Sequence, residues 1–136
     1  MPSNEGRVYF ALDGDDFEPD ELTCFLGIQP TSIKRKSKTQ SGQIINFCSW
    51  QLSTENIVRE HIDVFKMSQE IVNQLKPKQN LIIEAKSRFN IYPILEVVLW
   101  LSKEEEYSTP AIGFEVDTLK FLGEIGTFID IDTYIR

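Results

Sequence analysis

The side chains that most often act as nucleophiles and bases are scarce in this chain. It has one histidine, His61, and two cysteines, Cys24 and Cys48. A Cys-His or Ser-His-Asp arrangement would have to use His61 as its base, and no G-x-S-x-G segment is present to position a serine. One histidine and two separated cysteines are also a poor ligand set for zinc. We therefore expect no catalytic residue, no metal and no cofactor, which favours a protein that is not an enzyme.

Carboxylates are abundant, and the densest group lies near the start of the chain, at Asp13, Asp15, Asp16, Glu18, Asp20 and Glu21. Several oxygen ligands could hold a divalent cation, but the spacing matches no EF-hand loop. A turn followed by an acid-rich helix N-terminus explains the same residues without a metal. We expect Asp13, Asp15, Asp16 and Asp20 to form an exposed acidic surface.

A second acidic pair lies near the end of the chain. On a strand, Asp130 and Asp132 share one face with Phe128 and Tyr134, because side chains alternate between faces. Paired carboxylates can act as acid and base when their environments separate their pKa values. Solvent-facing carboxylates are the simpler interpretation. This face is then a mixed aromatic and acidic surface suited to docking.

The basic residues gather between Lys34 and Lys38, with Trp50 further along the chain. Positive charge combined with an aromatic ring can contact phosphate or RNA. The net charge of −7 opposes nucleic-acid binding, however, and favours encounter with a partner that has a basic surface. A solvated hairpin arm is the favoured interpretation of residues 34–38.

The elements that position these residues follow from periodicity and end signals. A strand over residues 7–12 and a turn at 13–16 precede a helix that begins at Pro19 and ends before Gly27. Residues 94–101 are apolar apart from Glu96, which fits a central strand or a buried helix beginning at Pro93. The other expected elements are a hairpin over 31–52, a helix from Ser53 or Thr54 to about Leu75 with His61 on the edge of its apolar stripe, strands over 80–89 and 111–116, a helix over 117–125 and a strand over 127–135.

This order, β-α-β-β-α-β-β-β-α-β, predicts an α+β fold with a mostly antiparallel sheet and helices packed on one face. A length of 136 residues fits a single domain over 1–136. We expect a flexible start at about 1–6 and a mobile hairpin tip at about 36–43. No apolar run is long enough to span a membrane. Two lone thiols and the lack of a secretory signal favour a cytoplasmic protein, and a Cys24–Cys48 disulfide is the alternative.

Two segments resemble a known family. They are Tyr9 to Thr31, including Asp13-Gly14-Asp15-Asp16 and Gly27-Ile28-Gln29-Pro30, and the ending Leu119 to Ile135. Together with Trp50, they resemble the bacterial domain of unknown function 4279 family. The resemblance implies a small bacterial protein with no assigned reaction. In place of a glycine that is typical of the family after Pro30-Thr31, this chain has the lysine-rich residues 34–38.

Together these patterns lead to one hypothesis and one alternative. The hypothesis is a non-enzymatic protein-interaction module, of immunity-protein type, that inhibits a toxin partner through acidic surfaces. The residues that we expect at its surface are Asp13, Asp15, Asp16, Asp20, Trp50, Phe128, Asp130, Asp132 and Tyr134. The alternative is a small-molecule-binding protein or enzyme with a pocket between sheet and helices, where His61, Trp50 or the Asp130–Asp132 pair would lie at the rim.

Overall fold

A computed structural model describes residues 3–38, 40–104 and 109–136. Its main sheet has the strand order β2-β5-β1-β7-β8, with β6 also paired to β1, and a separate two-stranded sheet joins β3 and β4. The strands are β1 (Glu5–Gly14), β2 (Ser32–Lys34), β3 (Ser37–Lys38), β4 (Ile44–Ile45), β5 (Cys48–Ser53), β6 (Ile57–Val58), β7 (Tyr92–Leu101) and β8 (Phe128–Ile135). The helices are α1 (Pro19–Leu26), α2 (Val64–Leu75), the 3-10 turn η1 (Lys76–Lys78), α3 (Gln79–Arg88) and α4 (Val116–Glu124).

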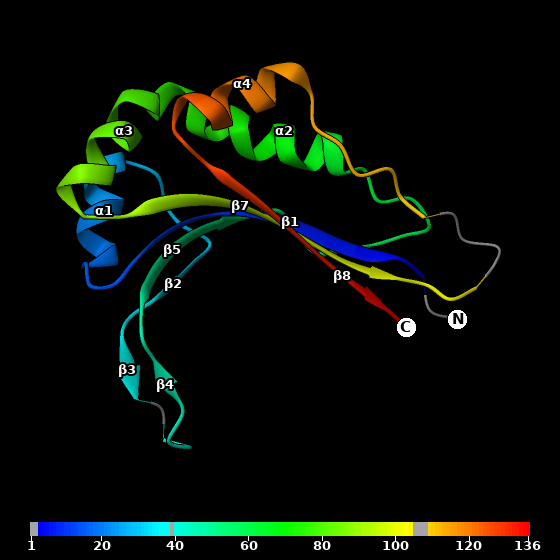
Figure 1. The fold of residues 1–136 in the computed structure, drawn as a ribbon, viewed down its shortest axis with the longest axis horizontal. Helices are drawn as coiled ribbons and strands as arrows, with labels where there is room; N and C mark the ends of the chain where they lie inside the picture. Colours follow the sequence, from blue (N-terminus) through cyan, green and yellow to red (C-terminus); the bar gives the residue numbers. More distant parts are fainter. Residues whose placement is uncertain (1–2, 39, 105–108) are drawn as a thin grey trace.

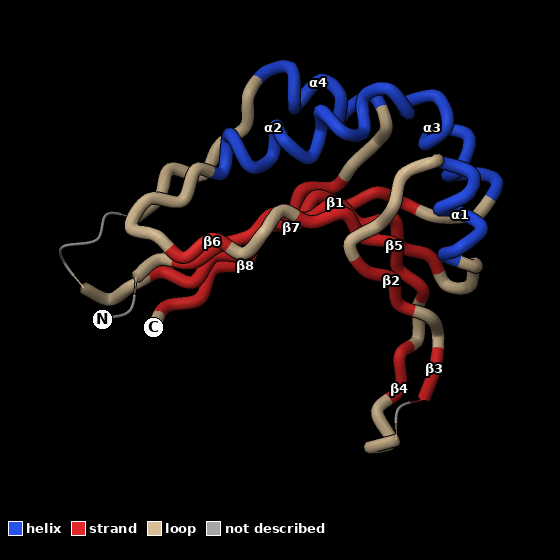
Figure 2. Tube along the Cα trace, turned by 180° about the vertical axis from the view of Figure 1, so that it is seen from behind, coloured by secondary structure: helices blue, strands red, loops and turns tan. Residues whose placement is uncertain are grey.

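The predicted fold class is confirmed. All strand pairs are antiparallel except β7 with β8, which run parallel because α4 provides a crossover between them. The helices lie on one face of the main sheet, and the β3–β4 arm extends away from the opposite face (Figures 1 and 2). None of the described helices has the length and apolar character that crossing a bilayer requires.

Every second side chain of the central strands points into the core between the sheet and the helices. Val8, Phe10 and Leu12 of β1 are fully buried, as are Leu95 and Leu99 of β7. Helix α2 meets them with a stripe of buried residues at helical spacing: Val64, Met67, Ser68, Ile71, Val72 and Leu75. The residues that alternate with these buried ones along β1 and β7 therefore face away from the helices.

The first predicted helix is confirmed at both ends. Pro19 is its first residue, and Gly27 closes it in the left-handed conformation at φ 71°. The segment 94–101 lies within strand β7, so the alternative of a buried helix is wrong. Strand β1 begins at Glu5, within the range expected to be flexible, whereas residues 1–2 and Thr39 of the expected hairpin tip lie outside the described residues.

The helix predicted from Ser53 or Thr54 is wrong in its first half. Helix α2 begins at Val64, where the Asp63 side chain accepts a hydrogen bond from the backbone N–H of Lys66 (3.0 Å). The residues before it include β6, which pairs with the start of β1. A short edge strand therefore replaces the expected helical turns, and His61 lies exposed in a loop.

Two predicted strands are also wrong. Residues 80–89 form most of helix α3, in which Ile82 and Ala85 are buried three positions apart while Ile83 is 44% exposed. The apolar residues of this segment alternate in the sequence as they would on a strand, but the residues that are buried follow helical spacing. Residues 111–115 form no strand. A Cβ atom on Gly113 would lie 2.2 Å from Cζ of Phe65, so this segment crosses closely over α2.

A carboxylate cluster on the helix-free face

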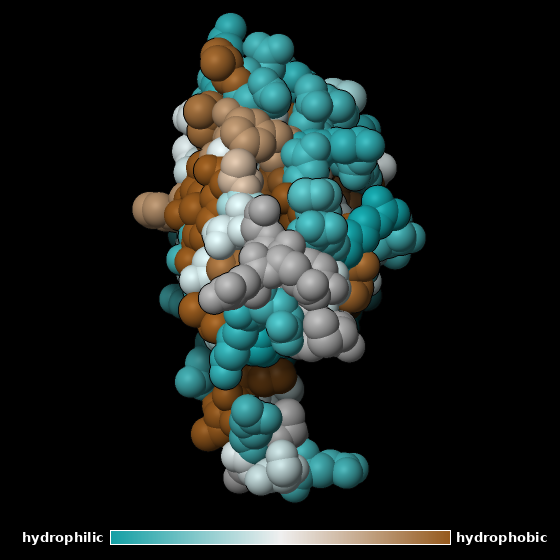
Figure 3. All heavy atoms as spheres, turned by 90° about the vertical axis from the view of Figure 1, so that its right-hand side faces the viewer, coloured by the Kyte–Doolittle hydropathy of each residue, from teal (hydrophilic) through white to brown (hydrophobic). Residues whose placement is uncertain are grey.

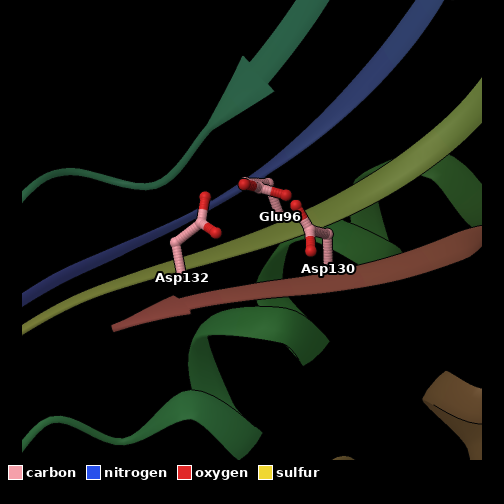
Figure 4. A group of neighbouring side chains, drawn as sticks. All are labelled: Glu96, Asp130 and Asp132. Carbon is pink, nitrogen blue, oxygen red and sulfur yellow. The ribbon is translucent and has the colours of Figure 1, made fainter. Parts of the chain in front are cut away.

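The face of the sheet without helices carries a cluster of three acidic side chains. Glu96 of β7 is paired with Asp130 of β8, and Asp132 lies two residues further along β8. One carboxylate oxygen from each residue lies within 4.8 Å of those from the other two. Figure 4 shows the three carboxyl groups turned toward one another. We call Glu96, Asp130 and Asp132 the carboxylate cluster.

Glu96 is the most deeply placed member of the cluster. It is 7% exposed, whereas Asp130 is exposed and Asp132 is half-buried. No ion pair joins any of the three to a basic side chain among the described residues. Burial, followed by the neighbouring Asp132 and Asp130 carboxyls, raises the pKa of Glu96 from 4.5 to about 8. The cluster therefore favours a shared proton or a positively charged group.

The cluster borders a groove that crosses three strands. The groove has a volume of about 420 Å³, and Tyr9, Asp13, Tyr92, Phe128 and Asp130 are among its lining residues. Burial raises the pKa of the Tyr9 hydroxyl, and the adjacent Glu96 adds to the rise. Burial also raises the pKa of Asp13, partly offset by the hydrogen bond that Ser49 Oγ donates to it (2.5 Å). We call this feature the sheet groove.

Aromatic pairs flank the cluster on both sides. Tyr92 and Phe128 pack edge to face with ring centroids 6.4 Å apart, and Trp100 stacks on Tyr134 at 5.8 Å. Phe128 is 66% exposed and Tyr134 is 51% exposed. Exposed rings beside carboxylates offer both charge and π faces to a cation.

The structure separates the surface residues expected from sequence into two regions. Asp13, Phe128, Asp130, Asp132 and Tyr134 lie together on the helix-free face, on β1 and β8. The other acidic residues of the first group lie in the turn after β1 and in the first turn of α1.

Within the second region, part of the charge is already paired. Arg35 binds Glu18 (2.6 Å) and Asp20 (2.8 Å), so the basic arm neutralises part of the acidic loop. Asp15 and Asp16 are exposed. The acidic loop therefore offers less unpaired charge than the sequence indicates.

Trp50 lies in the core and away from both surfaces. It is 0% exposed, and its Nε1 donates a hydrogen bond to Thr23 Oγ1 (3.0 Å). Both cysteines are free: Cys24 is exposed and Cys48 is buried. His61 lines a different depression on the helix side, of about 290 Å³, together with Arg59, Lys66 and Glu70.

Sequence reasoning did not identify Glu96 as a site residue. It stands in an apolar strand, where its one visible effect was to interrupt the run from Ile94 to Leu101. A single acid within an otherwise apolar central strand is the signal that could have identified it, because such strands seldom bury a charge without a partner.

The cluster has three carboxylate ligands of the kind that hard divalent cations prefer. The same arrangement accepts the ammonium group of lysine or the guanidinium group of arginine. The arrangement is therefore suited to binding a cation.

Comparison with known proteins gives a family but no activity. The family model described as domain of unknown function (DUF4279) matches residues 4–136. No curated protein and no solved structure matches the chain significantly.

Proposed function

The chain belongs to the domain of unknown function 4279 family, and the description of that family names no activity. We therefore infer the function from the helix-free face of the sheet. We propose that the chain is a non-enzymatic protein-interaction module, and that the carboxylate cluster and sheet groove bind a basic segment of its partner. An immunity-like protein that inhibits a basic toxin is the form of this function that we propose. A cytoplasmic location stays a prediction.

One observation carries the proposal: Glu96 is 7% exposed, faces two further carboxylates and has no ion-paired base among the described residues. Buried charges in proteins are usually paired or neutralised. A lysine or arginine of a partner would supply the missing charge, and its hydrogen bonds to carboxylates would be charge-assisted.

Two further features support a basic partner. The aromatic pairs beside the cluster provide rings over which a guanidinium or ammonium group can lie. The net charge of −7 attracts a basic protein at long range. Added salt should therefore slow association.

Two double variants separate the effect of where the acidic residues lie from the effect of the net charge. Asp130→Asn/Asp132→Asn removes two charges from the cluster, and Asp15→Asn/Asp16→Asn removes two from the exposed turn. Binding of a labelled lysine-rich peptide is measured by fluorescence anisotropy, and binding of partners from the native cell is measured by quantitative pull-down. The cluster variant should weaken both by at least about tenfold, whereas the turn variant should weaken them much less.

Two results would count against the proposal. Equal losses in the two double variants would show that net charge, and no particular site, governs binding. If millimolar Mg²⁺ or Ca²⁺ stabilised the wild type against heat, and Glu96→Gln removed that effect, the cluster would be a metal site.

A second candidate function rests on the depression beside α2. His61, Arg59 and Lys66 converge there with Glu55, Asp63 and Glu70 around about 290 Å³ of space. A small polar molecule that carries groups of both charges suits such a lining, as expected for a small-molecule-binding protein. Screening a metabolite library by thermal shift with His61→Ala as the control tests this candidate, and a flat response would exclude it.

A further inference from the structure

Strand β8 is an edge strand with an unpaired side. It has eight residues, pairs with β7, and no other described strand lies beyond it. Arg136, the next residue, turns its N–H toward the carbonyl oxygen of Leu101 and its C=O toward the N–H of Lys103, both at 2.9 Å. Successive residues of a parallel ladder turn alternately toward and away from the neighbouring strand. The backbone groups of Ile129, Ile131, Thr133 and Ile135 therefore point outward.

Three isoleucines of β8 lie on the helix side of this edge and are exposed. Ile129 is 37% exposed, Ile131 41% and Ile135 71%. Figure 3 shows hydrophobic residues gathered along its left-hand side, the side on which β8 runs. On the other face of the same strand lie Asp130 and Asp132. One strand thus presents isoleucines on one face and carboxylates on the other, together with backbone groups that no described strand pairs.

We propose that β8 binds its protein partner by strand addition, and that the added strand alternates basic residues, which lie on the side of the carboxylate cluster, with apolar residues, which lie on the side of Ile129 and Ile131. The expectation that the added strand carries basic residues rests on the proposed function. Main-chain hydrogen bonds supply affinity in this mode, and alternate side chains supply specificity.

The charges on β8 argue against a second copy as the occupant. In an antiparallel pair centred on Ile131, Asp130 of each copy would lie opposite Asp132 of the other. Like charges directly opposite one another destabilise such a pair, and charged residues on edge strands guard against self-association. The same carboxylates attract a strand that carries lysine or arginine at every second position.

The probe is a synthetic nine-residue peptide that alternates valine and lysine, and its affinity is measured by isothermal titration calorimetry. The matched control is the same peptide N-methylated on those alternate residues whose N–H groups face β8, which keeps the side chains and charge but cannot complete a ladder. We expect N-methylation to weaken binding by at least about tenfold, since several hydrogen bonds are lost. Hydrogen exchange at the amides of Ile129, Ile131 and Thr133 should slow when the unmodified peptide binds.

Each outcome separates this inference from the proposed function. If both peptides bind equally and no β8 amide is protected, strand addition is wrong and the acidic docking face still stands. If neither peptide binds, both proposals fail. Ile131→Pro removes one outward N–H without touching the ladder to β7, and it should weaken binding of the unmodified peptide alone. A dimer in light scattering that Ile131→Pro abolishes would identify a second copy as the occupant.

Discussion

Replacement of Glu96 by glutamine measures what it costs to hold an ionised carboxyl group in the cluster. Glu96 is 7% exposed, and its burial is the largest cause of the rise in its pKa from 4.5 to about 8. An acid whose pKa is raised by folding binds its proton more tightly in the folded state than in the unfolded state. Its stabilising contribution is therefore fully present below about pH 4.5 and is lost as the pH rises to about 8.

The size of the effect follows from the two pKa values. Each pH unit between them changes the free energy of unfolding by about 1.4 kcal/mol, so the total loss attributable to Glu96 is about 5 kcal/mol by pH 9. Glutamine keeps the length of the side chain, carries no charge and can donate its amide hydrogens to Asp130 or Asp132. We expect Glu96→Gln to be more stable than the wild type at pH 9 by roughly 3 kcal/mol or more, and to lack this pH dependence.

The assay is urea unfolding, followed by tryptophan fluorescence, at intervals from pH 5 to pH 9 in a metal-free buffer. Glu84→Gln is the control, because Glu84 is an exposed acid on α3 and its replacement makes the same chemical change, a carboxyl group replaced by an amide. The free energy of unfolding of the control should fall with pH as steeply as that of the wild type. A Glu96→Gln variant with the same steepness as the wild type would refute the argument that Glu96 is held protonated by its surroundings.

Four further substitutions test the fold. Trp50→Ala should lower the free energy of unfolding by about 3–5 kcal/mol in urea because the ring is fully buried; loss of partner binding without loss of stability would contradict its place in the core. Gly126→Ala should lower the melting temperature, since Gly126 has φ 71° and a Cβ would lie 2.7 Å from Nζ of Lys86. Gly123→Ala, with open space around its Cβ inside α4, should be neutral or stabilising, and the reverse order would show that the conformation at Gly126 is misplaced. Asp63→Ala should cost about 1 kcal/mol in urea through loss of the cap of α2, and no change would mean that another group begins that helix.

The sequence predicted well the features that depend on near neighbours along the chain. Pro19 and Gly27 mark the ends of α1 because a fixed φ suits the first turn of a helix and a left-handed residue suits its end. Alternation alone placed Asp130 and Asp132 on one face of β8 with Phe128 and Tyr134. The resemblance to the domain of unknown function 4279 family is likewise confirmed over residues 4–136.

Errors arose where two periods fitted the same residues. Between 80 and 89 both strand alternation and helical spacing describe the apolar positions, and packing of Ile82 and Ala85 into the core selects the helix. Before α2, Val58 was compatible with a helical stripe, whereas in the structure Ile57 and Val58 form β6 and pair with the first residues of β1. In both segments the choice depends on contacts with residues far away in sequence, which local propensity does not contain.

The amino-acid sequence by itself determined an α+β chain, its acidic charge and the shared face of Asp130 and Asp132. Only the tertiary structure brought Glu96 to those two residues, because the parallel pairing of β7 with β8 depends on the crossover through α4. The same packing buries Trp50 in the core and leaves β8 at the edge of the sheet, where no described strand pairs with its outer side. The geometry of a single strand determines how its side chains alternate. Which strand lies beside it depends on how all the elements pack to bury the core.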